Sequence, residues 1–162
     1  MSFPLTYHKL LLVSLLVIPM FLVCQKTDHV DSLNTALQET VDKQEQADLL
    51  NSIAEFYRTH KFDESLFYAQ QAYDLSLKTG YAKGQVDALT KKGAIYARKS
   101  DFYRALTMAR KADSIAVAND LISERISTQK LSGSIFIFLG DFKRASMHVI
   151  QGLKIAEKLD DK

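Results

Sequence analysis

Apolar positions recur at helical spacing from residue 47 onward. Leu50, Ile53, Ala54 and Tyr57 are spaced by 3, 1 and 3 residues, which places them on one face of a helix. A short polar stretch follows, and then comes a second set of positions spaced by 3, 4 and 3: Phe62, Ser65, Ala69 and Ala72. The pattern predicts two antiparallel helices joined by a tight turn.

The same hairpin pattern occurs three times in one register. Phe62, Phe102 and Phe142 are spaced by 40 residues, and small residues repeat at the same interval: Ser65, Ala105 and Ala145, then Ala72, Ala112 and Gly152. One hairpin cannot bury both of its apolar sides, so the copies must stack on one another. Three units are about the minimum for a stable stack. The chain is therefore expected to be all-α.

The positions that repeat resemble the signature of the tetratricopeptide repeat (TPR). The second unit carries it as Leu89, Gly93, Tyr96, Phe102, Ala105 and Ala112, and the third as Gly133, Phe136, Gly140, Phe142, Ala145 and Gly152. The resemblance implies a right-handed α-solenoid of antiparallel hairpins, with units at 47–81, 82–121 and 122–162. Lys92 and Ser132 depart from the signature, because an apolar residue is usual there.

The period of 40 residues exceeds the 34 of the common TPR, so each helix should be about one turn longer. This longer type is similar to the repeats of exported bacterial TPR proteins, which form the sensor region of histidine kinases and regulators.

Both ends of the stack need a cover. Residues 25–46 should form a lead helix over the first unit, with Leu33, Leu37 and Val41 as its apolar stripe. Asp31 or Ser32 would cap this helix. No such cover is recognisable after the third unit, so its hairpin is expected to be frayed, or covered by a partner or a second copy.

Residues 1–24 have the layout of a secretory signal. Lys9 precedes 14 uncharged residues, 10–23, which are too few to span a bilayer and include Pro19. We expect export to the periplasm or the bacterial cell envelope. Cys24 either carries a lipid anchor or is removed by cleavage before Gln25, and the bulky Val23 fits a lipoprotein signal poorly.

Charge narrows the range of partners. The formal net charge of the chain is +2, and the signs are interspersed. Nucleic acid would favour a strongly basic face, so none is expected as a partner. Membrane contact is expected only through the signal segment or a lipid anchor.

No pattern with a catalytic mechanism is present. The four histidines are His8, His29, His60 and His148. None of them has a neighbouring histidine at metal-ligand spacing. No phosphate-binding loop occurs, and Gly80 and Gly84 flank a link between units. Asp101 and Asp141 fit turn and cap positions better than an acid/base pair. We therefore expect a non-enzymatic protein without cofactor or metal.

The TPR resemblance implies that the first helix of each unit lines a concave surface. The residues that face it would be Asp48, Asn51, Glu55, Arg58, Asp87, Thr90, Ala94, Arg98, Ser127, Lys130, Ser134 and Ile137. The partner-binding residues among them would be Asn51, Glu55, Arg58, Thr90, Arg98, Lys130, Ser134 and Ile137. A carboxylate clamp of the chaperone-binding type is not expected, because Asn51 and Glu55 stand where Lys and Asn would be needed.

The leading hypothesis is a scaffold that binds a polypeptide partner. The alternatives are a sensory or regulatory segment of a signal-transduction system and a self-assembling structural subunit, the latter associating through the uncapped C-terminal hairpin.

Overall fold

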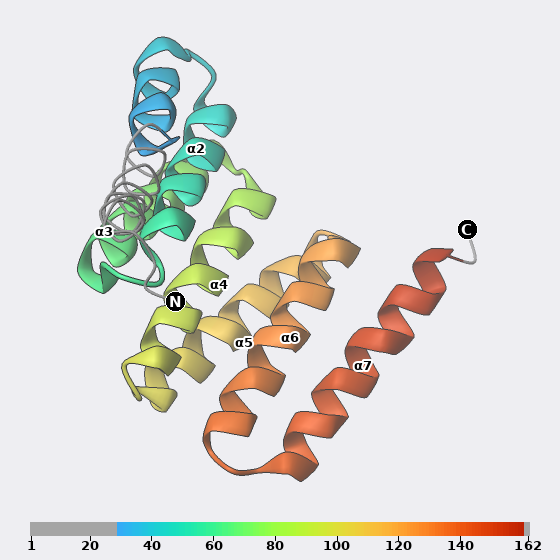
Figure 1. Cartoon of the computed structure of the whole chain (residues 1–162). Helices are drawn as coiled ribbons and strands as arrows, with labels where there is room; N and C mark the ends of the chain where they lie inside the picture. Colours follow the sequence, from blue (N-terminus) through green and yellow to red (C-terminus); the bar gives the residue numbers. More distant parts are fainter. Residues whose placement is uncertain (1–28, 161–162) are drawn as a thin grey trace, which may run out of the picture.

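The computed structural model describes residues 29–160, and all its regular elements there are helices. A helix over residues 29–39 precedes α2 (Lys43–Tyr57), α3 (Phe62–Thr79), α4 (Ala82–Arg98), α5 (Phe102–Ala118), α6 (Ile122–Phe138) and α7 (Phe142–Asp160). Three antiparallel hairpins, α2/α3, α4/α5 and α6/α7, stack side by side (Figure 1). The all-α, TPR-like solenoid is confirmed. The expected signal segment, with Cys24, lies outside the described residues.

One type of turn joins the helices from α3 to α7. The residues with positive φ are Gly80, Ser100, Asp120 and Gly140, at 68°, 61°, 52° and 72°. In each case the next amide donates to a carbonyl five residues earlier, for example Asp101 N to Tyr96 O at 2.8 Å. This is the hydrogen bond of a Schellman helix end. The turns recur every 20 residues, both within and between hairpins, and this spacing produces the 40-residue period.

Small side chains fill the contacts between paired helices. Ala54, Ala69 and Ala72 in the first unit, and Ala105 and Ala109 in the second, are almost fully buried. Their lack of bulk lets the helix backbones approach closely. The larger buried side chains pack around these contacts: Ile53, Leu89, Ile95 and Ile135. In the first two units the apolar faces expected from the spacing are thus largely the buried faces.

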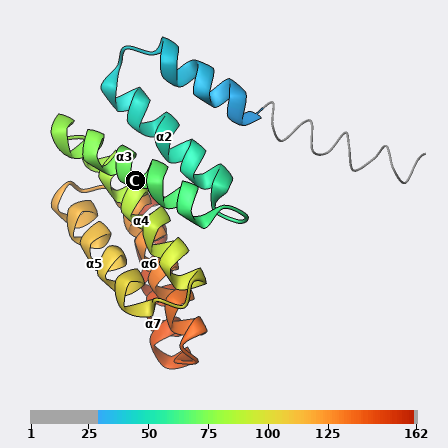
Figure 2. The same ribbon diagram turned by 90° about the vertical axis from the view of Figure 1, so that its left-hand side faces the viewer.

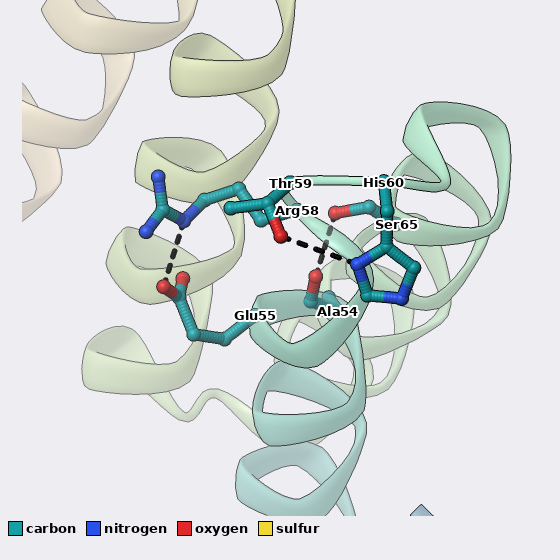
Figure 3. A network of polar contacts seen from close by, with 6 residues as sticks. All are labelled: Ala54, Glu55, Arg58, Thr59, His60 and Ser65. Atoms are coloured by element: carbon teal, nitrogen blue, oxygen red, sulfur yellow. Dashed lines mark hydrogen bonds and ion pairs between the residues drawn. The ribbon is translucent and has the colours of Figure 1, made fainter. Parts of the chain in front are cut away.

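The first hairpin differs from the others at Ser65. Its hydroxyl donates to the Ala54 carbonyl at 2.7 Å (Figure 3). That carbonyl is available because the Arg58 amide bonds to Glu55 O, at 3.1 Å, as α2 ends. The first unit therefore has serine where the other two units have alanine, because the buried Ala54 carbonyl needs a hydrogen-bond donor.

The lead helix covers α2, but its bounds differ from the expectation. Leu37 packs on a cluster formed by Leu50, Ala72 and Ala88. The helix ends at residue 39, and α2 begins at Lys43, four residues before the expected start of the first unit. Figure 2 shows this helix beside α2.

Three residues of the expected lead helix are placed differently by the structure. Val41 is 87% exposed in the link, because the Asp42 side chain caps α2 by accepting from Gln44 N at 2.8 Å. Asp31 and Ser32 lie inside the lead helix and do not cap it.

Gly84 also differs from its expected role. Of these two glycines, Gly80 ends α3, whereas Gly84 is buried in the first turn of α4. A Cβ at residue 84 would clash with Ser76 Oγ and the Tyr81 ring. Glycine is thus needed there for close packing of α3 against α4.

Candidate functional site

A groove of about 430 Å³ runs across the first helices of the three hairpins, α2, α4 and α6. Its lining residues are Glu55, Arg58, Thr90, Lys91, Ala94, Ala97, Arg98, Ser127, Lys130, Leu131, Ser134 and Phe138. The TPR resemblance implied that this helix set would line the concave surface. The groove therefore arises from the repeat itself, because each unit contributes the same helix face.

The structure brings most of the expected binding residues together and separates two from them. Glu55, Arg58, Thr90, Arg98, Lys130 and Ser134 all line the groove. Asn51 lies outside this groove and lines an adjoining hollow; it is only 3% exposed, and its Nδ2 donates to Gly84 O at 3.2 Å, which ties α2 to α4. Ile137 is 53% exposed but does not line the groove, whereas the adjacent Phe138 does.

Four lining residues were missed by the sequence interpretation: Lys91, Ala97, Leu131 and Phe138. Each lies three or four residues along its helix from an expected position; Leu131, for example, precedes Ser134 by three. Helical neighbours at these spacings share a face. A prediction that took in these neighbouring positions on each first helix would have included all four residues.

The groove is basic. Its cationic side chains are Arg58, Lys91, Arg98 and Lys130, against one carboxylate, Glu55. Arg58 Nε pairs with Glu55 Oε1 at 2.7 Å, so these two charges largely offset each other (Figure 3). The remaining three cations face a floor that contains Ala94 and Leu131. Such a surface attracts anionic groups and also accepts apolar ones.

A second hollow, of about 500 Å³, extends the concave surface toward the N-terminal half of α2. It mixes Asp48 and Asp87 with Lys83 and Lys91. Burial raises the pKa of Asp87, although Lys91 and Lys83 oppose this shift. The Tyr81 hydroxyl donates to both oxygens of Asp48, at 3.0 and 3.2 Å. The concave surface is thus basic at one end and mixed in sign at the other.

Titratable groups elsewhere have structural roles. Asp101 and Asp141 accept the amides of Arg104 and Arg144, at 3.0 and 2.9 Å, as caps of α5 and α7. These backbone hydrogen bonds lower the pKa of both carboxyls. His148 stacks on the Phe136 ring at 5.3 Å.

Within residues 29–160, no three His, Cys, Asp or Glu side chains gather as metal ligands would. No helix in that range is long and apolar enough to cross a bilayer.

Residues 21–130 match the family described as the SusR N-terminal TPR domain. The chain belongs to this family. The SusR-type match ends at Lys130, within α6, while the hairpin pattern continues through α7. Helical repeat folds of this kind are typically binding modules without catalytic activity. No curated protein matches the chain.

A solved structure shares the fold. The chain is similar to BtubC (BKLC) from P. vanneervenii, with a TM-score of 0.68 and 18% sequence identity. The likeness covers 85% of this chain and 59% of BtubC, so the chain spans about three fifths of that protein. This likeness shows the fold, while the SusR-type TPR family indicates an interaction scaffold of the TPR class.

Proposed function

We propose that this SusR-type TPR domain is a non-enzymatic scaffold that binds a polypeptide segment in its concave groove. The observation that supports this most is the groove itself, which crosses all three hairpins and combines an apolar floor with basic side chains. Adjacent packed helices lie about 10 Å apart, so three first helices span roughly 20 Å. An extended segment of about six residues covers that length at about 3.3 Å per residue.

The chemistry of the lining indicates an acidic, partly apolar segment. Ala94, Ala97 and Leu131 offer contacts to apolar side chains, while Arg98 and Lys130 are exposed and available for carboxylates. Arg98 also lies over the Phe62 ring, at 5.7 Å, which helps to fix its guanidinium. Charge would mainly steer association and set specificity, and the apolar floor would supply affinity.

A peptide-display screen against the purified chain tests this function. Enriched peptides should contain Asp or Glu beside apolar residues. Arg98→Glu combined with Lys130→Glu should weaken their binding at least about tenfold, equivalent to about 1.4 kcal/mol. Lys78→Glu with Arg110→Glu is the matched control, because both residues are exposed on second helices and the charge change is the same. Basic enriched peptides, or equal losses in the two variants, would contradict the proposal.

We further propose a regulatory or sensory role in the bacterial cell envelope. Membership in a family defined on the N-terminal domain of SusR supports the role. The signal-like pattern of residues 1–24 supports export, to the periplasm or to a lipid anchor at Cys24. Cell fractionation with intact mass measurement tests this. A cytoplasmic chain that retains residues 1–24 would contradict it.

A self-assembling structural subunit is the second candidate, and the apolar outer face of α7 favours it. Head-to-tail stacking would bring this face against α2 of the next copy. The helix over residues 29–39 already packs beside α2 (Figure 2). Open-ended stacking would have to displace that helix, so the structure favours closed association over a fibre.

A further inference from the structure

The outer face of α7 exposes side chains whose counterparts in the other hairpins are buried. Val149 is 50% exposed, whereas Ala69 and Ala109, at the same register position, are each 1% exposed. Ile137, at the end of α6, is 53% exposed, and its counterpart Ala97 is 5% exposed. Ile137 and Val149 therefore occupy positions that are covered in the preceding hairpins, and within residues 29–160 no element covers them.

The interior hairpins show what makes that contact. Leu131 and Ile135, one turn apart on α6, pack on Ala97 and Ala109 of the preceding hairpin. The cover is thus the apolar face of a helix. On α7 the matching stripe consists of positions spaced by 4, 3 and 4 residues, as in helix pairs with interdigitating side chains: Phe142, Ser146, Val149 and Leu153. Phe142 and Leu153 are 70% and 58% exposed.

The charged residues beside this stripe are complementary to the same residues on a second, antiparallel α7. Lys143, Ile150 and Glu157 are spaced by seven residues, so they form one line along the edge of the stripe. If two α7 helices pair antiparallel with Ile150 at the centre, Lys143 meets Glu157 of the partner subunit, and the reciprocal pair forms at the other end. In a parallel pair Lys143 would face Lys143 of the partner subunit, and Glu157 would face Glu157 of the partner subunit, so like charges would meet.

We propose that α7 pairs antiparallel with α7 of a second copy of this chain, about a two-fold axis near Ile150. The half-exposed side chains of Ile137, Phe142, Val149, Ile150 and Leu153 amount to roughly 500 Å² of apolar surface, near the upper end for a patch on a monomer. Two such patches together reach about 1,000 Å², the lower bound for a specific interface. Because the interface is self-complementary, it produces a closed dimer.

Light scattering coupled to size-exclusion chromatography, over a range of protein concentrations, tests the pairing. The wild-type chain should approach the dimer mass with increasing concentration. Leu153→Asp should give a monomer, because it places two carboxylates in the interface. Leu77→Asp is the matched control and should still dimerise, since Leu77 is 56% exposed on α3, away from α7. Circular dichroism establishes that both variants are folded.

A charge exchange tests the orientation of the two helices. Lys143→Glu or Glu157→Lys alone should weaken dimerisation, and the double variant should restore it. A wild-type monomer at all concentrations, an equal effect of Leu77→Asp and Leu153→Asp, or a double variant no better than the single ones would each overturn the proposal. The groove lies on the first helices, so Leu153→Asp should leave peptide binding unchanged, and the two proposals fail independently.

Discussion

Two glycines in the same register position should respond in opposite ways to replacement by alanine. Gly93 and Gly133 are 40 residues apart, each in the first helix of a hairpin and facing the second helix. An added Cβ at residue 93 would lie 2.8 Å from Leu131 Cδ2 and 3.4 Å from Ala105 O. At residue 133 the nearest atom is Ala145 O at 3.5 Å, which is an ordinary contact. The difference arises because Leu131 belongs to the following hairpin, which covers Gly93.

The expected magnitudes follow from two opposing contributions. Alanine in a helix interior is about 1 kcal/mol more favourable than glycine. Overpacking a buried contact costs about 1–3 kcal/mol, and Leu131, 8% exposed in the core cluster, must shift to accept the methyl group. Gly93→Ala should therefore lower the free energy of unfolding by about 1 kcal/mol, while Gly133→Ala should raise it by up to about 1 kcal/mol.

Urea denaturation followed by circular dichroism measures both changes. The variants should be compared at one protein concentration, because association would add a concentration-dependent contribution. The midpoint should fall for Gly93→Ala and rise for Gly133→Ala. If Gly133→Ala destabilised the chain as much as Gly93→Ala, the reasoning from the stacked hairpins would be refuted.

Three further changes have defined outcomes. Ser65→Ala should lower the free energy of unfolding by about 1 kcal/mol, since Ala54 O loses its donor; an unchanged urea midpoint would contradict this. The hydrogen bond from the Arg104 amide lowers the pKa of Asp101 in the folded chain. The Asp101 carboxylate therefore stabilises the fold fully above its unfolded pKa of about 3.9, and this stabilisation is lost as pH falls through the lower folded pKa. Asp101→Asn should flatten thermal stability against pH in that acidic range, and an unaltered profile would count against the cap. Burial lowers the pKa of His148, although the charge of Asp113 opposes this shift. The neutral imidazole therefore contributes fully to the stability of the fold above about pH 6.5, and this contribution declines as pH falls toward the folded pKa. In thermal melts, the stability of His148→Gln should not show this decline at falling pH. If the variant declined as much as the wild type, the pH dependence would arise from other groups.

Periodicity predicts the helices well because every hairpin repeats the same pattern of apolar and small residues. Tyr57, Phe62 and Ala72 each have counterparts 39 or 40 residues on, so one unit reinforces the assignment of the next. The lead helix has no counterpart, and its predicted range of 25–46 runs through Val41 and past the observed end at residue 39. That residue continues the spacing from Leu37, but the local cap at Asp42 overrides the apolar pattern.

The candidate site was predicted only as far as helix faces determine it. Arg98 and Lys130 line the groove because their register places them there. Asn51 has a similar register but is buried by its hydrogen bond to Gly84 O, which depends on how closely α2 and α4 approach. That distance is a property of two packed helices and cannot be seen in the spacing along one. Ile137 is 53% exposed on α6 but does not line the groove.

Nuclear magnetic resonance mapping of a selected acidic peptide most directly tests binding in the concave groove. The methyl signals of Ala94, Ala97 and Leu131, on α4 and α6, should show the largest shifts on titration. Those of Val117 on α5 and Leu77 on α3 should stay in place. Shifts concentrated on α3, α5 or α7, with the groove methyl groups unaffected, would contradict the proposed function.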